Sequence, residues 1–592
     1  NGPRISRLDV RVAGASEQSV EYAYTDSGCL AAVTDALGHA EVFEYDGQRR
    51  MVATTLKTGV TFRYEYEAGT GRCSRTWGPK GLYDLAFRYE PENHLTYADG
   101  EEPRVYTTDD AGHVTREALP SGAVLVERAY DADGLLIADA NGAGHGTKHW
   151  YDARGNLIRT VDAAGVTTTW EVGDDDLPRR RVRPSGEVTE YRYDARGALA
   201  FVSVSSGLSY TLSYDARGRV ERTACNDGSS SVHRYDEHHN RVSTLTADGV
   251  TTSFVYDSLG RPVSKSEANG RATALIRDRL GRVTSLRRPD GSTFTRKYDA
   301  RGNLVEEVDP LGNATVYRYG GMGRVTQVKT AAGAEWKLDY TSNERLATIK
   351  NPKGEVYGFQ YDEAGRLIAE RTFDGRALTY RRDRAGFVSR VDYPDGSHRT
   401  FEYDPAGRVV LDEGSDGSRI EYKRNAAGHV VSGRQTQGGR TSEVVFERDP
   451  LGRITTEWQG DRVARYAHDP RGRLIKRVLP NGIETELAYG LDGALVGVTH
   501  ASQSFVLRRG QDAGDVTVAP SSGSFESRAR FDAAGRLVEQ MVKNPVGGEA
   551  VVHRVYDYDR AGRVTRIADR SGISEYAYDR VDQLVAESFG VA

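Results

Sequence analysis

The chain contains little of what builds a disulfide-linked, metal-binding or membrane-spanning protein. Its 592 residues include three cysteines, Cys29, Cys73 and Cys225, which are odd in number and too far apart for a zinc motif, a redox motif or a disulfide framework. No apolar run approaches the roughly 18 residues of a membrane helix. Hydrophobic residues make up only 38% of the chain, and mean hydropathy is −0.59. These shortages predict a protein with little deep core.

The chain also lacks an excess of charge of either sign. It has 80 Lys and Arg residues against 85 Asp and Glu residues, and the net charge is −5, so there is no basic field of the kind that attracts nucleic acid. Most of the basic residues are arginine, which hydrogen-bonds in a plane and stacks on aromatic rings. Tyrosine and glycine are abundant, with 33 and 65 residues, whereas disordered chains are poor in aromatics. This composition favours many strands and turns.

One heptapeptide is written twice. YDARGNL occurs at Tyr151–Leu157 and at Tyr298–Leu304, with near-copies from Tyr193 and Tyr214. If the Tyr of each YD pair is called the anchor, anchors or degenerate anchors recur every 21 residues from position 130 to position 424, and they continue with small slips on both sides. The period predicts about 27 structural units. Interruptions at 69–71, 435–440 and 543–550 are loops where partner contacts are expected.

Two glycines recur at fixed positions in the repeat. The first stands four residues after the anchor, as at Gly218, and the second stands fourteen after it, as at Gly228, often as an Asp-Gly or Asn-Gly pair. Such pairs are strong hairpin signals. Where the first glycine is missing, Asn93, Asp176 and Asp582 take its place, and these residue types tolerate positive φ. Two turns in 21 residues leave room for two short strands.

The strand before each anchor alternates large and small residues, as in YGFQY at Tyr357–Tyr361, which is typical of one face of a β-strand. About 54 strands would make a flat sheet ~260 Å wide, and a sheet of that width curls, splits or closes. The polar end of the second strand disfavours stacked sheets. We therefore expect an all-β fold, one long spiralling antiparallel sheet of about 27 hairpin repeats that encloses a polar space.

The YDxxGR residues are expected to build the turns, with Arg and Asp satisfying backbone groups and Arg stacking on the tyrosine of the next unit. We assign this structural role to six copies of the triplet: Tyr151, Asp152, Gly155, Tyr193, Asp194, Gly197, Tyr214, Asp215, Gly218, Tyr298, Asp299, Gly302, Tyr361, Asp362, Gly365, Tyr403, Asp404 and Gly407.

No motif predicts catalysis, a cofactor or a metal. His233, His238 and His239 share one repeat, but the adjacent pair falls in a turn without the spacing of a metal site. Asp174–Asp176 replaces a whole YD corner and supplies too few oxygens at the offsets that calcium needs. The glycine-rich stretches Gly142–Gly146 and Gly320–Val325 do not open a helix after a strand, so phosphate binding is not expected. The periodic tyrosines favour a structural ladder over a sugar-binding surface.

The motif YDxxGRL followed by a turn like PDG, at Tyr361–Leu367 and Tyr403–Val409, resembles the YD repeat of Rhs proteins. That family includes bacterial Rhs polymorphic toxins, the B/C components of Tc toxin complexes and the extracellular shell of teneurins. The resemblance implies a hollow β-shell that holds a C-terminal toxin domain, delivered in many Rhs proteins by type VI secretion. It further implies an immunity protein and VgrG/PAAR-type delivery proteins as partners, and a bacterial protein that is assembled in the cytoplasm and exported. It implies no contact of this segment with nucleic acid or membrane.

The chain departs from the family pattern in one respect. The family's C-terminal core motif is absent, because DPLG at Asp309–Gly312 and Asp449–Gly452 belongs to ordinary turns. We therefore expect residues 1–592 to be one shell fragment, most regular over 130–444, with the delivery region, the Rhs core and the toxin domain outside it. Two other functions stay open: a cell-surface protein for adhesion or glycan binding, and a Tc-like B/C cocoon component. An enzyme ranks below them, since no nucleophile–base pair or metal constellation is present.

Overall fold

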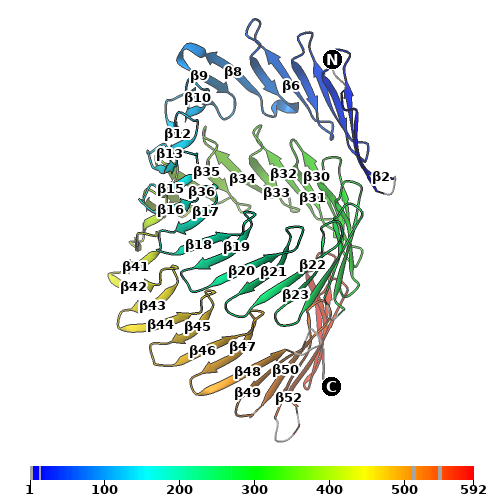
Figure 1. Cartoon of the computed structure of the whole chain (residues 1–592), viewed down its shortest axis with the longest axis vertical. Coiled ribbons are helices and arrows are strands. Elements are labelled where there is room, and N and C mark those ends of the chain that lie inside the picture. Colours follow the sequence, from blue (N-terminus) through cyan, green and yellow to red (C-terminus); the bar gives the residue numbers. More distant parts are fainter. Residues whose placement is uncertain are drawn as a thin grey trace. The chain divides into compact units, whose positions relative to one another are not determined.

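Consecutive β-hairpins build the chain (Figure 1). The computed structural model describes residues 4–12, 15–267, 270–509, 515–523, 525–544, 548 and 550–591. Within these residues, 55 strands form a single antiparallel sheet from β1 (Arg7–Val12) to β55 (Leu584–Gly590), and strands adjacent in sequence are neighbours in the sheet. The described helices are two single 3₁₀ turns, η1 (Pro79–Gly81) and η2 (Pro91–Asn93). The prediction of an all-β sheet of hairpin repeats is confirmed.

One repeat consists of an anchor strand, a first turn, a second strand and a second turn. In β20 (Ser209–Tyr214) and β21 (Val220–Cys225) the first turn closes with two backbone hydrogen bonds, from Gly218 N to Asp215 O (3.0 Å) and from Asp215 N to Arg219 O (2.9 Å). Gly218 has φ +79°. A tight turn followed by a left-handed glycine is a three-residue hairpin loop, which adds one residue to one strand and increases its twist.

The second turn has the same form. Between β21 and β22 (Ser230–Tyr235), Gly228 has φ +91°, and its N–H donates to Cys225 O at 3.1 Å. Asp227 is not among the residues with positive φ, so the Asp-Gly pair does not form the two-residue turn in which both residues are left-handed. The pattern therefore marks the position of the second hairpin, while the loop is one residue longer than that signal usually implies.

Residues other than glycine occupy the left-handed position in some first turns. Asp176 and Asp582 have φ of +60° and +66°, as their residue type predicts. The expectation for Asn93 is wrong: His94 carries the positive φ, at +55°, because the 3₁₀ turn η2 takes up Pro91–Asn93 and moves the left-handed residue one place along the chain.

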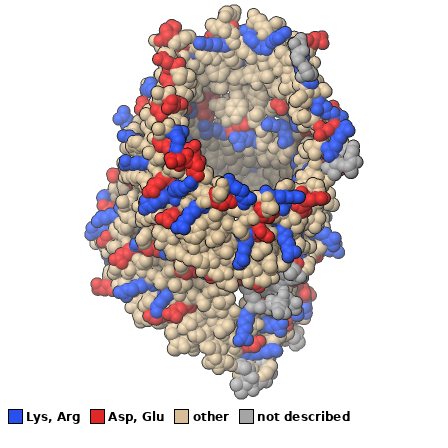
Figure 2. Space-filling view, in the orientation of Figure 1, with Lys and Arg blue, Asp and Glu red and all other residues tan. Residues whose placement is uncertain are grey.

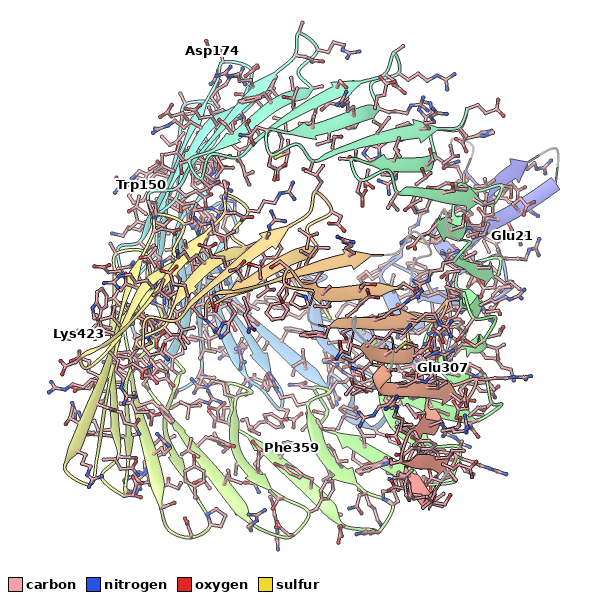
Figure 3. All side chains as sticks on the ribbon, turned by 90° about the horizontal axis from the view of Figure 1, so that it is seen from below. Glu21, Trp150, Asp174, Glu307, Phe359 and Lys423 are labelled. Atoms are coloured by element: carbon pink, nitrogen blue, oxygen red, sulfur yellow. The ribbon has the colours of Figure 1, made fainter. Side chains whose placement is uncertain are left out.

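The sheet has two unlike faces. In β34 (Val356–Tyr361), Tyr357, Phe359 and Tyr361 are half-buried, whereas Val356 and Gln360 are exposed. We call the face that carries the anchors the tyrosine face and the other the outward face. Among the residues labelled in Figure 3, Phe359 belongs to the tyrosine face, and Trp150 and Lys423, each one residue before an anchor, belong to the outward face.

Deep burial is scarce. In the described part of the chain only ten hydrophobic residues are buried, and most of them are alanine or leucine. The accessible surface is 33781 Å², whereas a compact chain of 65.1 kDa would expose about 20,600 Å². Acidic and basic side chains are interspersed over the surface seen in Figure 2. The excess surface follows from a sheet that is one layer thick and reaches solvent on both faces.

The chain divides into two units, each made of segments that are far apart in sequence. Unit 1 contains residues 1–61, 212–337 and 483–592, and unit 2 contains residues 62–211 and 338–482. Within each unit these segments pack against one another through their turns. No helix in the described residues is both long and apolar enough to cross a membrane.

Candidate functional site

The aspartate after each anchor holds the first turn together. Asp215 Oδ1 accepts the backbone N–H groups of Arg217 (2.9 Å) and Arg219 (3.0 Å), and Asp215 Oδ2 accepts from Arg219 Nε at 2.7 Å. The hydrogen bond from the Arg219 N–H is the largest of the effects that hold the pKa of Asp215 below its ordinary value, followed by that from the Arg219 side chain. The short side chain thus satisfies the loop's backbone donors while it stays ionised.

The arginine of the turn connects one repeat to the next. Arg219 Nη1 donates to Asp236 O at 3.0 Å, and its guanidinium lies 4.6 Å from the centre of the Tyr235 ring. Arg282 repeats both contacts, with a 2.7 Å hydrogen bond to Asp299 O and a 5.0 Å approach to the Tyr298 ring. The stacking expected from the sequence is therefore present, and one side chain joins an aspartate, a backbone carbonyl and the tyrosine of the next unit.

Each anchor also reaches back to the preceding repeat. The Tyr151 hydroxyl donates to Leu136 O at 2.9 Å, fifteen residues earlier. In the described part of the chain, the same bond at 2.7 to 3.0 Å is made by further anchors, among them Tyr193, Tyr235, Tyr256, Tyr298, Tyr319, Tyr361 and Tyr403. Because the accepting carbonyl belongs to the start of a second strand, this bond ties neighbouring hairpins at one edge of the sheet.

Four anchors that look degenerate in sequence carry arginine and keep this bond. Arg382 Nη2 donates to Leu367 O at 2.9 Å, and Arg382 Nη1 donates to Gly386 O at 2.9 Å in its own turn. The other three make both contacts as well: Arg277, Arg424 and Arg448. Sequence reasoning missed this equivalence. The available signal was that the substitutes are arginine, a long donor that can reach the same carbonyl.

The eighteen repeat residues singled out from the sequence lie at six corners, where each tyrosine ends an anchor strand and the aspartate and glycine lie in the first turn that follows. Their six glycines have φ between +77° and +93°. In each turn the aspartate Oδ1 accepts the backbone N–H of the residue four positions later. The structure thus brings each triplet together locally, and the six corners do not form one site.

The histidines that share one repeat do not converge on a ligand. His233 lies on β22 and hydrogen-bonds Ser231 (3.2 Å) and Thr244 (3.1 Å), and burial lowers its pKa. His238 is exposed in the turn, and His239 takes the left-handed position, with φ +69°. Within the described residues, no group of three or more His, Cys, Asp or Glu side chains has a geometry suited to a metal ion.

The acidic corner at Asp174–Asp176 is engaged by arginines. Asp175 pairs with Arg179 at 2.6 Å, and Asp176 pairs with Arg154 at 3.0 Å, while the side chain of Asp174 is fully exposed. The arginine contacts point to an ion-paired turn between β16 (Thr167–Val172) and β17 (Pro178–Val182).

The glycine-rich and DPLG stretches are ordinary turns. Gly142–Gly146 contains the second turn before β14 (Gly146–Tyr151), and Gly320–Val325 contains the first turn between β30 (Ala314–Gly320) and β31 (Arg324–Lys329). Asp309 and Asp449 accept backbone N–H groups from their own loops in the same way as Asp215. The loop at 543–550 includes residues 545–547 and 549, which lie outside the described residues.

Contacts between distant segments follow one rule: a second turn meets a first turn of the segment about twelve repeats later. In unit 2, Arg104 Nη1 donates to Glu363 O at 2.9 Å, 259 residues away. In unit 1, Arg279 Nη2 donates to Ser16 O at 3.4 Å, 263 residues away, and Arg536 pairs with Asp290 at 3.2 Å. Each pairing thus brings together a turn from one edge of the sheet and a turn from the opposite edge.

Unit 2 has the densest of these seams. Arg345 in a first turn forms a bidentate ion pair with Glu102, and this pair is the largest of the effects that lower the pKa of Glu102. Beside it, Tyr83 N donates to Ser342 O at 2.9 Å, and the Tyr83 hydroxyl donates to Glu344 at 3.1 Å. Glu344 is buried and takes the left-handed position with φ +57°. The 21-residue period of the sequence does not predict which of these distant residues pair.

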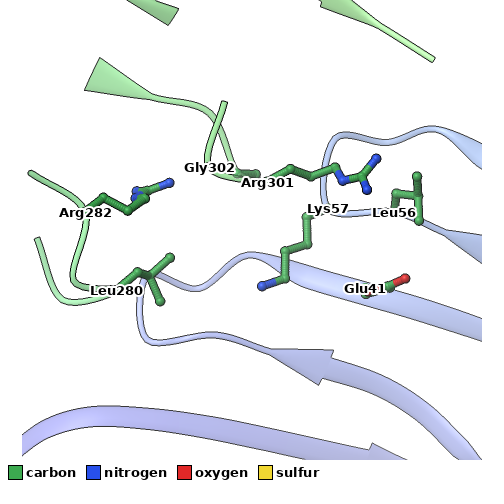
Figure 4. A pocket seen from close by; sticks show the side chains of 8 residues that line it. Glu41, Leu56, Lys57, Leu280, Arg282, Arg301 and Gly302 are labelled. Carbon is green, nitrogen blue, oxygen red and sulfur yellow. The ribbon is translucent and has the colours of Figure 1, made fainter. Parts of the chain in front are cut away.

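A cleft in unit 1 lies at such a seam (Figure 4). Glu41, Leu56 and Lys57 line one side, and the first turns at 280–282 and 300–302 line the other. The Lys57 ammonium is 2.6 Å from Asp35, and Arg282 Nε is 2.6 Å from Asp278. Lys57 already holds a carboxylate of the second turn one repeat earlier, and Arg282 holds one of its own turn. The cleft is therefore part of the seam and does not stand out as a ligand site.

The repeat and the sheet define the class of protein as a YD-repeat β-sheet, and comparisons with known proteins agree. The family model described as Teneurin YD-shell matches residues 232–438. Among curated relatives, double-stranded DNA deaminase toxin A of Burkholderia cenocepacia is 30% identical over 182 residues, and the probable deoxyribonuclease RhsB of Dickeya dadantii is 25% identical over 173 residues. The chain is thus similar to Rhs and YD-repeat proteins over these regions.

The matched regions are small parts of these relatives. They cover 30% and 28% of this chain, but only 12% of the deaminase toxin and 11% of the deoxyribonuclease. Solved structures of the TcdB2–TccC3 complex and of the Photorhabdus luminescens Tc holotoxin pore are similar over 97% of this chain and 34% of theirs, with 14% and 15% identity and a TM-score of 0.41 in both cases.

Proposed function

We propose that the chain is the wall of a shell that encloses a toxin domain of the same polypeptide and shields the producing cell from it until delivery. The observation that carries the proposal is the exposed surface of 33781 Å², about 1.6 times that of a compact chain of equal mass. A sheet that is one layer thick has both faces in solvent and encloses no core of its own. Such a wall is suited to separating two spaces.

The relatives support the toxin part of this proposal. Two of them are named as a deaminase toxin and a probable deoxyribonuclease, and this chain matches only a small fraction of each. We propose that residues 1–592 form one shell fragment, with the toxin domain, the Rhs core and the delivery region in other parts of the polypeptide. Export by type VI secretion with VgrG/PAAR-type proteins, and neutralisation by an immunity protein, complete the proposal.

The turn network supports a structural role for the repeats. The Asp, Arg and anchor residues of the corners bind backbone groups and one another, as Asp215, Arg219 and Tyr235 do. We propose that the chain itself is not an enzyme. A hydrolase activity of the purified chain that disappears on changing His238, His239 or Asp175 would contradict this.

The test of enclosure is protease protection. The chain is extended at its C-terminus by a protease-sensitive marker segment, and digestion of the marker by trypsin is compared with digestion of the same marker in free form. Encapsulation predicts that the marker survives while exposed loops are cut. Cleavage of the attached marker at the rate of the free marker would refute the proposal. Small-angle scattering provides a second check, because a compact chain of this length has a radius of gyration of about 25 Å and a shell exceeds it.

Adhesion is the second candidate, and the match to the teneurin shell model over residues 232–438 favours it. An adhesive shell binds a cell surface or a glycan through its outward face. Saturable binding of the purified chain to cells, without protection of the marker, would select this candidate over encapsulation.

A further inference from the structure

One carboxylate on the tyrosine face, Glu370, lacks the basic partner that Glu307 and Asp412 have. All three stand nine residues after an anchor, as do Glu117, Asp139, Glu457 and Glu587. Glu307 pairs with Arg296 at 2.9 Å, and Asp412 forms a bidentate pair with Arg399 at 2.8 and 2.9 Å. Among the described residues, Glu370 has no ion pair, and its hydrogen bonds come from two tyrosines. In the same part of the chain, Glu457 also accepts hydrogen bonds without an ion pair, from one tyrosine, Tyr466, and from Gln459.

The repeats that contain Glu370 and Asp412 share two aromatic neighbours of the acid, with Tyr422 in the place of Tyr380, but the second repeat has Ser415 in the place of Phe373. Phe359 stands opposite Glu370 in the sheet, as Phe401 stands opposite Asp412. Four residues before the anchor, however, the first repeat has Tyr357 where the second has Arg399. In the first repeat, the acid Glu370 is therefore present, but the phenol of Tyr357 stands where Arg399 supplies a cation in the second.

The surroundings of Glu370 are aromatic. Its carboxylate accepts the Tyr357 hydroxyl at 2.5 Å and the Tyr380 hydroxyl at 2.7 Å, one on each oxygen. The Tyr357 ring lies 4.9 Å from the Phe359 ring and 5.4 Å from the Phe373 ring, and the second pair meets edge to face. The bond to Glu370 raises the pKa of Tyr357, and burial followed by the same bond raises that of Tyr380.

Charge and rings together select a cation. Each carboxylate oxygen uses one acceptor site on a tyrosine and keeps further lone pairs for another donor. Aromatic faces attract ammonium and guanidinium groups, and the attraction grows as the cation is desolvated. All of these side chains are only half-buried, so the site can be reached from the tyrosine face.

We propose that Glu370, Tyr357, Tyr380, Phe359 and Phe373 bind the guanidinium or ammonium group of a basic side chain of a bound polypeptide. The guest supplies the cation that Arg399 supplies internally two repeats later. A polypeptide is the favoured source because an arginine side chain of this same protein already fills the matched position. The bound polypeptide that we propose is an enclosed segment of the toxin domain, and this choice rests on the proposed function. The cation site itself does not depend on that function.

The experiment measures binding of N-acetyl-arginine N-methylamide to the full chain by saturation-transfer NMR, with the citrulline analogue as an uncharged control of the same shape. We expect the arginine compound to bind at millimolar concentration and at least about tenfold more tightly than the citrulline compound. Equal binding of the two compounds, or no binding of either, would overturn the proposal. Tetramethylammonium binding without arginine binding would assign the site to small cations and overturn it as well.

Three variants locate the site. Glu370→Gln removes the charge but keeps hydrogen bonding, and Tyr357→Arg supplies an internal cation as in the matched repeat; both should abolish binding while circular dichroism stays unchanged. Arg399→Tyr frees Asp412 and should add a second, weaker site, because Ser415 stands in the place of Phe373. Unchanged binding in the first two variants, or no added binding in the third, would refute the comparison on which the proposal depends. None of these binding measurements depends on whether the chain encloses a segment. A negative result in them can therefore be distinguished from a negative result in the marker-protection test.

Discussion

Removing one whole repeat should leave the sheet intact, whereas removing half of one should not. Deletion of Tyr214–Arg234 joins Ser213 to Tyr235, so β20 keeps an anchor, and the first turn at Asp236 takes the place of the deleted one. Two strands disappear, and every later strand keeps its direction. Deletion of Tyr214–Thr223 removes the first turn and most of β21, and all later strands then run opposite to their present direction relative to the earlier ones.

The cost of the whole-repeat deletion is small. Tyr235 loses the stacked Arg219, because the preceding repeat has Ala198 at that position, and a cation–π contact of this kind contributes about 0.5–1 kcal/mol. Contacts that span the cut meet the first turn one repeat later, where Arg366 replaces Arg345 opposite Glu102 and a backbone carbonyl again faces Arg104. Ala300 replaces Arg279 and Gly365 replaces Glu344, so the hydrogen bonds to Ser16 O and from the Tyr83 hydroxyl are lost, at about 1 kcal/mol each. Arg271 and Asp532, which bond across a seam in unit 1, both lie after the cut and keep their separation of 261 residues.

The half-repeat deletion moves every later first turn to the opposite edge of the sheet. Seams join second turns to first turns, so each contact that spans the cut is lost, including those of Glu102 with Arg345 and of Arg104 with Glu363 O. At about 1 kcal/mol or more each, these losses approach the 5–15 kcal/mol that stabilises a typical fold. The register of the strands at the junction is also disturbed.

The assay compares soluble yield, circular dichroism and trypsin resistance of the two deletion variants with those of the parent. We expect a soluble β-protein from the deletion of 21 residues and aggregation or rapid proteolysis from the deletion of ten. If both variants behave alike, whether stable or ruined, then the 21-residue unit does not build the fold and the rule for the seams is wrong.

Three further predictions concern single corners. Gly218→Val places a β-branched residue at φ +79° and should cost about 1–3 kcal/mol, seen as faster hydrogen exchange confined to the neighbouring repeats, while Gly218→Asn should cost less. Tyr298→Leu removes the 2.8 Å hydrogen bond to Val283 O and should lower the denaturation midpoint. Tyr298→Arg should keep both the hydrogen bond and the midpoint, because Arg277 and Arg382 already serve as anchors. An equal loss of stability in both variants would contradict the equivalence of tyrosine and arginine anchors. The pKa of Asp215 is lowered in the folded chain, chiefly by the hydrogen bond from the Arg219 N–H. The contribution of Asp215 to stability is therefore complete above the unfolded pKa of about 3.9 and is lost as pH falls through the lower folded pKa. Asp215→Asn should flatten this acid dependence of the free energy of unfolding in urea titrations, and an unchanged profile would contradict the prediction.

The sequence by itself determines the local structure of this protein. A period of 21 residues, two glycines per period and an alternating anchor strand are enough to predict a hairpin, because turn geometry and strand alternation depend on neighbours within a few residues. The Asp215–Arg219–Tyr235 linkage was also predictable, since its members lie within one repeat and the start of the next. Asn93 shows the limit: an added 3₁₀ turn moved the left-handed position to His94, and no local pattern signals such a shift.

Only the tertiary structure decides which distant corners meet. The partners of Glu102, Arg104 and Ser16 lie 243, 259 and 263 residues away. These separations depend on how sheet twist accumulates over about a dozen repeats, and a small change per strand would select other partners. The same holds for Glu370: its sequence position suggests an ion pair like that of Asp412, and only the structure shows that aromatic rings and two hydroxyl groups surround it instead.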